Sequence, residues 1–318
     1  MPRFSMTSLL LSVLFALFLP LRASAARADL DAARGGIELD LHSASGIVIE
    51  QSTGEVLYEM NADEKLEPAT VTKVMSLLLI FEALDDGTLT LDEGVVGSAY
   101  AASMGGSQIW LEEGETLTVD EMIKAMCVVS ANDCTVAMAE KVAGSEEAFV
   151  VRMNERAETL GMTNTHFVNC TGLPVEGHYT TARDITVMTR ELLKHEGILN
   201  YTTIWMDSLR GGKMALTNTN KLIRFYPGAN GMKTGYTSSA KYCLSATAKR
   251  DDMQLIAAVM KGATSDERFA DAKKLLDFGF ANFSVHKTDI TPLEPIYVRG
   301  GVSPYAAVTY GAKPKSAI

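Results

Sequence analysis

Residues 68–87 read PATVTKVMSLLLIFEALDDG. Pro68 stands where proline is favoured, at the entrance of a helix, and Gly87 closes the stretch as glycine does just past a helix end. The residues between them, Ala69 to Leu84, are strongly apolar. We therefore expect a helix that is buried in a core, with other layers packed around it.

Strand patterns lie on both sides of this helix. The segments Gly46–Glu50 and Val56–Glu59 are joined through Ser52–Gly54 and predict a hairpin. Near the other end, Tyr242–Lys249 and Met253–Met260 predict two further strands. An early hairpin, a helical middle and late strands favour an α+β fold in which N- and C-terminal strands share one antiparallel sheet, flanked by helices and a helical lobe.

The middle of the chain carries helix-start signals. Thr118–Glu121 has the sequence of a capping box, and Ser145, Thr181 and Ser265 are candidate N-caps. The helices that they predict are Met122–Val128, Glu146–Leu160, Ala182–His195 and a last helix from Ser265 to about Phe280.

The two ends of the chain differ from the middle. Residues 1–25 have the basic, apolar and small-residue order of a secretory signal peptide, which predicts export to the periplasm or the outer face of the cytoplasmic membrane. We assign 26–284 to the main domain and 285–318 to an incomplete C-terminal β domain or flap, because about 30 residues cannot bury a core of their own. Ile296–Arg299 and Ala306–Tyr310 are candidate strands there.

Composition excludes several classes of function. The chain of 318 residues has a formal net charge of −10, and removal of Arg3 and Arg22 with the signal peptide leaves −12, so we expect no nucleic-acid partner. No membrane anchor is seen, and attachment to a membrane surface would need an amphipathic tail, which the last eight residues do not form.

The four cysteines are scattered among apolar neighbours, which favours buried thiols and leaves a disulfide open. No metal or other cofactor is expected, because the histidines and cysteines lack metal-ligand spacing.

Thr70 and Lys73 place a hydroxyl and an amine together at the start of this helix. Position 70 falls in the first helical turn, where unpaired backbone N–H groups favour developing negative charge. Residues three apart share a helix face, so Lys73 stands beside the Thr70 hydroxyl. A lysine that is partly desolvated in a cleft has a lowered pKa and can accept the hydroxyl proton.

Two later strings complete this pattern. Ser130 and Asn132 belong to Ser-Ala-Asn, where alternate residues of an extended segment point the same way; the hydroxyl can pass a proton to a leaving amine, and the amide can hold a substrate carbonyl and the lysine. Lys233–Gly235 (KTG) lies at the start of the late strands. Its cation and hydroxyl can bind a substrate carboxylate.

The KTG string also bears on how a substrate lies in the cleft. The absent side chain at Gly235 is expected to let an extended peptide lie against the strand. The backbone N–H groups of Tyr236 and Thr70 are expected to form an oxyanion hole. Each string alone has little specificity, and the joint occurrence of all three in order indicates one acyl-transfer site.

With these residues in place, the chain resembles the D-alanyl-D-alanine carboxypeptidases among the low-molecular-mass penicillin-binding proteins, over about Ala44 to Phe283. The resemblance rests on Pro68–Lys73 (PATVTK), Ser130–Asp133 (SAND), Asn164–Phe167 (NTHF), Thr171–Leu173 (TGL), His178–Asp184 (HYTTARD) and Gly231–Thr237 (GMKTGYT). In such families the first motif is S-x-x-K. Here threonine stands at the serine position.

The resemblance implies a β-lactamase/transpeptidase-like fold and an acyl-enzyme cycle on peptidoglycan stem peptides that end in D-Ala-D-Ala, with β-lactams as trapping inhibitors. By matching motifs it implies the roles of base for Lys73, proton shuttle for Ser130 and substrate anchor for Asn132. Lys233 with Thr234 would form the carboxylate site, and Arg268 matches an arginine that helps to bind the terminal carboxylate.

Four functions are weighed for this chain, and the threonine at position 70 divides the first two. Its extra methyl restricts the side-chain rotamer and crowds the approach to a carbonyl, so we expect weak or absent turnover in a preserved cleft. The chain is then an impaired carboxypeptidase or an inactive peptidoglycan-binding relative. A class A β-lactamase ranks lower, because Glu176, its candidate for activating water, lies in what reads as a surface turn. A histidine-dependent hydrolase ranks last, because none of the three motifs contains histidine.

Overall fold

The computed structural model describes residues 38–286 and two short strands, β10 (Ile296–Tyr297) and β11 (Tyr305–Ala306). The chain divides into a unit Met1–Asp40, which lies almost wholly outside the described residues, and a unit Leu41–Ile318, to which everything below belongs. The predicted signal peptide, residues 1–25, lies outside the described part. Within the predicted C-terminal segment, β10 and β11 pair antiparallel close to the two expected strands.

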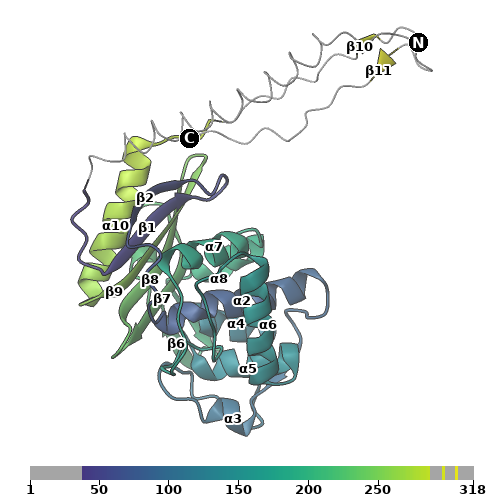
Figure 1. Cartoon of the computed structure of the whole chain (residues 1–318). Coiled ribbons are helices and arrows are strands. Elements are labelled where there is room, and N and C mark those ends of the chain that lie inside the picture. The colour runs from purple at the N-terminus through teal and green to yellow at the C-terminus, as the bar shows by residue number, and fades with distance from the viewer. Residues whose placement is uncertain (1–37, 287–295, 298–304, 307–318) are drawn as a thin grey trace. The chain divides into compact units, whose positions relative to one another are not determined.

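A five-stranded antiparallel sheet forms one layer of the unit (Figure 1). Its order is β2 (Val56–Met60), β1 (Ser45–Glu50), β9 (Met253–Gly262), β8 (Lys241–Arg250) and β7 (Ala229–Thr237). The N-terminal hairpin and the C-terminal strands therefore share one sheet, which confirms the predicted α+β class. β7 is an edge strand.

The two faces of the sheet contact different helices. On one face, Gly279 of α10 (Ser265–Asn282) packs against Leu255 of β9. On the other face, Thr189 of α7 (Ala182–Leu192) shares a hydrogen bond of 2.8 Å with Ser245 of β8. Because side chains alternate along a strand, Lys233, which is opposite Ser245 in the register, also points toward the helical side.

The helical lobe is built around the segment that opens the sequence. It forms a 3-10 turn, η1 (Ala69–Thr72), that continues into α2 (Lys73–Asp85). Every residue from Lys73 to Phe81 is buried, and α2 packs against α5, α6 and α7. The expected core helix is confirmed, because a helix that is apolar on all sides is stable only when other elements cover it.

The rest of the lobe consists of short helices and strand pairs. The helices are α3 (Ala99–Ala102), α4 (Val119–Val128), α5 (Asn132–Ala143), α6 (Glu146–Thr159), η2 (Glu196–Ile198), α8 (Leu199–Thr202) and α9 (Leu222–Phe225). The strand pairs are β3 (Gly94–Val96) with β4 (Thr116–Thr118), and β5 (Met206–Leu209) with β6 (Met214–Thr217). None of the helices in the described ranges is long and apolar enough to cross a bilayer.

Most of the predicted helix starts are confirmed. Thr118 and Glu121 form the capping box of α4, and the Ser145 and Thr181 hydroxyls accept backbone N–H groups at the starts of α6 and α7. The cap of α10 is a correction: Thr264 and not Ser265 accepts the N–H of Glu267. Both residues are hydroxyl side chains, so sequence alone does not choose between them.

Candidate functional site

A groove of about 460 Å³ lies where the start of the core helix meets the edge strand β7 and the turn before α5. The residues that line it are Thr70, Gly106, Ser107, Ser130, Asn132, Leu173, Thr219, Thr234, Gly235, Tyr236, Thr237, Tyr242 and Arg268. The remaining two predicted site residues, Lys73 and Lys233, are almost completely buried, with 0% and 1% of their surface exposed. The fold thus brings all nine predicted site residues to one place.

Thr70 is half-buried at the first turn of η1, as predicted. Its hydroxyl donates a hydrogen bond of 3.0 Å to the carbonyl oxygen of Thr234 on β7. The hydrogen bonds found among residues 38–286 include none between the Thr70 hydroxyl and the Lys73 amine. The hydroxyl therefore lies in the groove but is directed at the edge strand and not at the lysine.

Lys73 is held below the groove by two acceptors. Its Nζ donates to Asn132 Oδ1 at 2.5 Å and to the Thr171 carbonyl oxygen at 3.0 Å. Burial, and next the charge of Lys233, keep the pKa of Lys73 well below the usual lysine value. A neutral amine has two hydrogens, and these two acceptors match them, so its lone pair is left to accept a proton.

Ser130 and Asn132 are reached by a backbone that differs from the predicted extended segment. Ser130 is in the left-handed region (φ 65°), and Asn132 already begins α5, a helix that the sequence analysis did not anticipate. The turn still directs both side chains at the buried lysines. Ser130 Oγ accepts a hydrogen bond of 2.8 Å from Lys233 Nζ, and Asn132 Nδ2 donates to the Gly105 carbonyl oxygen at 2.7 Å.

Lys233 connects the second and third motifs. Besides Ser130, its Nζ contacts the Thr234 carbonyl oxygen at 3.0 Å. Burial lowers the pKa of Lys233 to about 7. Because Ser130 Oγ accepts from Lys233, its own hydrogen remains available to a substrate atom in the groove.

Gly235 makes a close approach to another segment that the sequence did not predict. A Cβ atom at this position would lie 2.8 Å from the Pro68 carbonyl oxygen and 3.1 Å from the Thr70 nitrogen. The missing side chain thus leaves room for the chain's own η1 turn. This close approach sets Thr70 against the edge strand. Gly235 also lines the groove, and the extended peptide expected along this strand stays a prediction.

Arg268 lies in the groove wall, as the family resemblance implied. Its Nη1 donates to the carbonyl oxygens of Gly235 (3.1 Å) and Cys243 (3.3 Å), and its guanidinium stacks over the rings of Tyr242 and Phe269. Burial lowers the pKa of Arg268 to about 10, so it stays cationic at neutral pH. With Lys233, it makes this end of the groove suited to an anion.

Sequence reasoning missed three parts of the site. Thr219 shares a hydrogen bond of 2.7 Å with the Thr234 hydroxyl, Tyr242 forms part of the wall, and the carbonyl of Thr171 holds Lys73. Thr171 was quoted within a family string, but a backbone carbonyl has no side-chain signature. Thr219 sits in an ordinary Asn-Thr-Asn loop that carries no signal.

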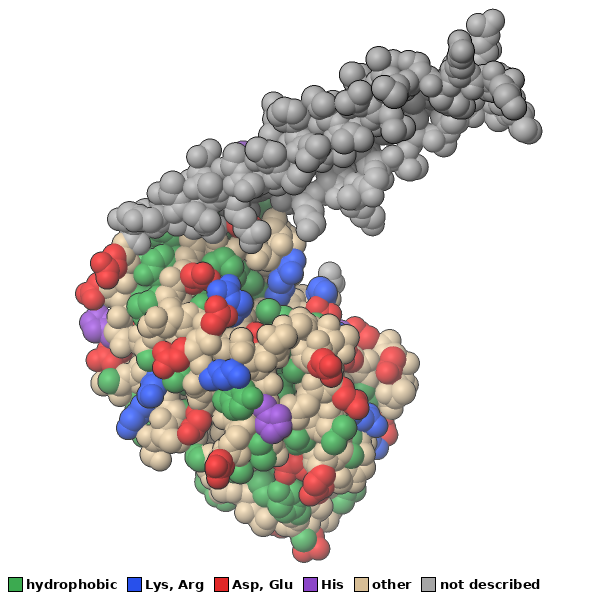
Figure 2. All heavy atoms as spheres, viewed as in Figure 1, with side chains coloured by type: hydrophobic (Ala, Val, Ile, Leu, Met, Phe, Trp, Pro, Cys, Tyr) green, Lys and Arg blue, Asp and Glu red, His purple; other side chains and the backbone are tan. Residues whose placement is uncertain are grey.

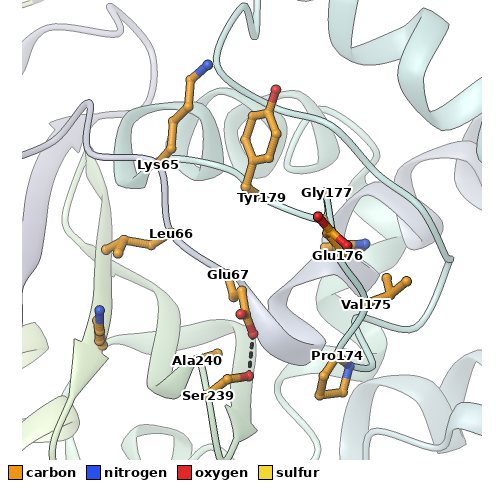
Figure 3. Close-up of a pocket in the computed structure, with 12 residues that line it drawn as sticks. Lys65, Leu66, Glu67, Pro174, Val175, Glu176, Gly177, Tyr179, Ser239 and Ala240 are labelled. Carbon is orange, nitrogen blue, oxygen red and sulfur yellow. Dashed lines mark hydrogen bonds between the residues drawn. The ribbon is translucent and has the colours of Figure 1, made fainter.

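A second hollow of about 650 Å³ lies nearby and is lined by residues 65–67, 174–179, 239–240 and 261. Figure 3 shows the loop with Pro174 and Val175 across from Glu67, whose carboxylate accepts a hydrogen bond from Ser239. Glu176, the carboxylate that a class A β-lactamase would need, lines this hollow and not the groove around Thr70. Its placement does not favour that alternative.

The four cysteines lie in the interior of the protein. All four cysteines are buried free thiols in the structure, in agreement with the preferred interpretation. Burial raises the pKa of the thiols, to about 12 for Cys127 and about 11 for Cys243.

On the face of the protein in Figure 2, acidic and basic side chains are interspersed and do not gather into one basic patch.

Comparison with known proteins identifies the family. The model of the D-alanyl-D-alanine carboxypeptidase family (peptidase S11) matches residues 32–264. The chain belongs to the D-alanyl-D-alanine carboxypeptidase family. This membership confirms the resemblance stated from the motifs.

Individual members of the carboxypeptidase family agree with this assignment. D-alanyl-D-alanine carboxypeptidase DacF of Bacillus subtilis is 49% identical over 88% of this chain and 73% of its own length. DacC of Escherichia coli is 36% identical over 78% of this chain and 63% of its own. The chain thus spans less than two thirds of the length of DacC.

Solved structures of the same class share the fold. Penicillin-binding protein 5 from Haemophilus influenzae has a TM-score of 0.79 at 28% identity, over 85% of this chain and 80% of its own. Penicillin-binding protein D2 from Listeria monocytogenes, in its ampicillin-bound form, has a TM-score of 0.71 at 31% identity, over 77% of this chain and 100% of its own.

Proposed function

We propose that the protein is an exported D-alanyl-D-alanine carboxypeptidase whose nucleophile is Thr70, and that the threonine slows the acylation step. The observation that carries the proposal is the convergence of the Thr70 hydroxyl, the two buried lysines and the Ser130 hydroxyl around one groove. The proposed substrate is a peptidoglycan stem peptide ending in D-Ala-D-Ala. The predicted signal peptide supports export.

The reaction begins with proton transfer from Thr70 to Lys73. Neutral Lys73 is the base, and the deprotonated Thr70 oxygen attacks the carbonyl carbon of the penultimate D-alanine. The backbone N–H groups of Thr70 and Tyr236 are the proposed donors to the oxyanion of the tetrahedral intermediate. For this step the Thr70 hydroxyl must turn away from the Thr234 carbonyl, to which it is hydrogen-bonded.

Collapse of the intermediate expels the terminal D-alanine. Ser130 donates its hydrogen to the leaving nitrogen, and Ser130 is in turn supplied with a proton from Lys233, whose Nζ lies 2.8 Å away. The proton that Lys73 took from Thr70 passes to Lys233, so both lysines regain their starting forms. Water then attacks the ester at Thr70 with neutral Lys73 as base, the ester bond breaks, the Thr70 oxygen takes that proton back, and the shortened peptide leaves. Atoms balance, because one water is consumed for each peptide bond broken.

Recognition of the substrate's end rests on charge. The terminal carboxylate would lie near Lys233, the Thr234 hydroxyl and Arg268, while Asn132 would hold the peptide carbonyl. A β-lactam carries a carboxylate and a strained amide and would follow the same path to a stable acyl-enzyme. The ampicillin- and cefotaxime-bound structures of the Listeria relative support this part of the proposal.

Mass spectrometry of the intact protein and of its proteolytic peptides after exposure to benzylpenicillin tests the proposal. We expect an adduct on the peptide that bears Thr70, together with slow release of D-alanine from a D-Ala-D-Ala stem-peptide mimic. An adduct without D-alanine release would favour the inactive binding relative. Persistent hydrolysis of nitrocefin would favour a β-lactamase, and an adduct on any other residue would refute the assignment of the nucleophile.

A further inference from the structure

The residue directly before the nucleophile has an unusual backbone. Ala69 is in the left-handed region (φ 49°) and is only 2% exposed. A residue with a Cβ atom adopts this conformation at an energetic cost and keeps it only when its surroundings fix it. Because Thr70 follows at once, whatever fixes Ala69 also sets the direction of the Thr70 side chain.

A chain of buried hydrogen bonds ends on this residue. The N–H of Val168 donates to His178 Nδ1 at 3.1 Å, so Nδ1 is an acceptor and the neutral imidazole carries its hydrogen on Nε2. His178 Nε2 lies 2.8 Å from the Thr72 hydroxyl, which therefore accepts. The Thr72 hydroxyl donates its own hydrogen to the Ala69 carbonyl oxygen at 2.8 Å.

Burial makes this chain a fixed part of the protein. His178 is 4% exposed and Thr72 is completely buried. Phe167 packs edge-on against the imidazole at 5.8 Å between ring centroids. Burial also lowers the pKa of His178 to about 4, so the neutral form that the hydrogen bonds require is present throughout the neutral range.

Gly172 packs directly against the Ala69 carbonyl, beside the Thr72 hydroxyl. A Cβ atom on Gly172 would lie 1.9 Å from the Ala69 oxygen, so only glycine fits there. Thr171, the residue before it, holds Lys73 Nζ through its carbonyl at 3.0 Å. The same turn therefore fixes the backbone before the nucleophile and the amine of the proposed base.

We propose that His178 is a positioning residue that orients Thr70 by holding the Ala69 carbonyl through the Thr72 hydroxyl. The proposal rests on the proposed function for its kinetic consequence, whereas the held turn itself does not depend on it. His178 lines the second hollow and not the groove around Thr70. Its sequence neighbours Gly177 and Tyr179 are labelled in Figure 3.

Substitutions of His178 and Thr72, the two side chains in this series of hydrogen bonds, separate a positioning role from a packing role. His178→Leu keeps apolar volume and removes both hydrogen bonds, whereas His178→Gln can accept from Val168 and donate to Thr72. Thr72→Val removes the hydroxyl and keeps the shape, whereas Thr72→Ser keeps the hydroxyl. The control is His286→Leu, which replaces an exposed histidine near the end of the described part.

The first measurement is the saturation kinetics of acylation by a fluorescent penicillin, which separates the binding constant from the acylation rate constant. We expect H178L and T72V each to lower the acylation rate constant by about tenfold or more, since a misplacement of ~1 Å costs on the order of a hundredfold. The binding constant should change by less than about twofold, because Lys233, Thr234 and Arg268 are untouched. H178Q and T72S should retain the wild-type rate, and the double variant H178L/T72V should be no slower than either single variant.

The second measurement is hydrogen–deuterium exchange of a peptide spanning residues 66–74. We expect faster exchange in H178L and T72V and unchanged exchange in H178Q, T72S and H286L. Wild-type acylation or unchanged exchange in folded T72V or H178L would overturn the proposal, and so would failure of H178Q to rescue. If no variant or wild type is acylated but exchange follows the expected order, the proposed function fails while the held turn stands.

Discussion

Replacement of Thr70 by serine is the sharpest test of how the threonine affects the chemistry. In the structure the Thr70 hydroxyl is bound to the Thr234 carbonyl at 3.0 Å, while Lys73 Nζ is bound to Asn132 and Thr171. To react, the oxygen must rotate toward the lysine, and the methyl on the same carbon must rotate with it. Serine has no methyl to move, so Thr70→Ser removes that constraint and leaves the hydroxyl.

The size of the effect follows from two costs. An off-rotamer side chain costs about 0.5–1.5 kcal/mol, which is about 2- to 13-fold in rate. An oxygen that remains displaced from its attacking position by a fraction of an ångström adds to this, because ~1 Å costs on the order of a hundredfold. We expect T70S to raise the second-order rate constant of acylation by roughly 10- to 100-fold.

The assay is the time course of labelling by a fluorescent penicillin over a range of concentrations. Thr88→Ser is the matched control, since Thr88 is exposed just beyond the end of α2 and should give the wild-type rate. Thr70→Ala should give no adduct. Labelling rates within twofold for T70S and wild type would refute the claim that the threonine methyl slows acylation. Labelling of T70A would refute the assignment of Thr70 as the nucleophile.

Two further outcomes are expected. The specificity constant kcat/KM should fall as pH rises through about 7, because burial lowers the pKa of Lys233 to about 7 and its proton is needed to bind a carboxylate and to resupply Ser130, whereas Lys73 acts in its neutral form. Lys233→Arg should remove this alkaline limb but lower the rate at every pH, because arginine stays charged and gives up no proton to Ser130. A wild-type kcat/KM still rising from pH 7 to 9 would contradict the role of Lys233. Gly235→Ala should lower the rate of penicillin labelling by roughly a hundredfold and also lower the melting temperature, because the added methyl group would meet the Pro68 carbonyl at 2.8 Å. A wild-type labelling rate in this variant would show that the contact between η1 and β7 does not fix the position of Thr70.

Much of the fold could be read from the sequence because local signals agreed with the tertiary structure. The capping box at Thr118 and Glu121, the hairpin turn after Glu50 and the apolar run of α2 each have a direct physical cause in a few neighbouring residues. The pairing of early and late strands followed from the order of elements. α5 was not predicted because its N-cap residue is Ala131, which has no side-chain oxygen to mark a helix start.

The parts of the site that escaped prediction depend on contacts between distant segments. Positive φ at Ala69 and Ser130 has no sequence signal, since neither residue is glycine or asparagine. Ala69 is fixed by Thr72 and Gly172, and Gly172 is about a hundred residues away in sequence. The contact of Gly235 with Pro68 and Thr70 could not be predicted for the same reason, because that turn lies far away in sequence.

The pairing of β1 with β9 has a consequence for how the protein folds. Ser45 lies opposite Met260, so the second and third strands of the sheet are joined across roughly 200 positions of sequence. The hairpin made first during synthesis keeps one side of β1 without its partner until nearly the whole chain has emerged, which favours slow folding and a long interval open to aggregation. The edge strand that carries Lys233 and Thr234 belongs to the same late segment. Lys73 is therefore synthesised long before the strand that completes the groove beside it.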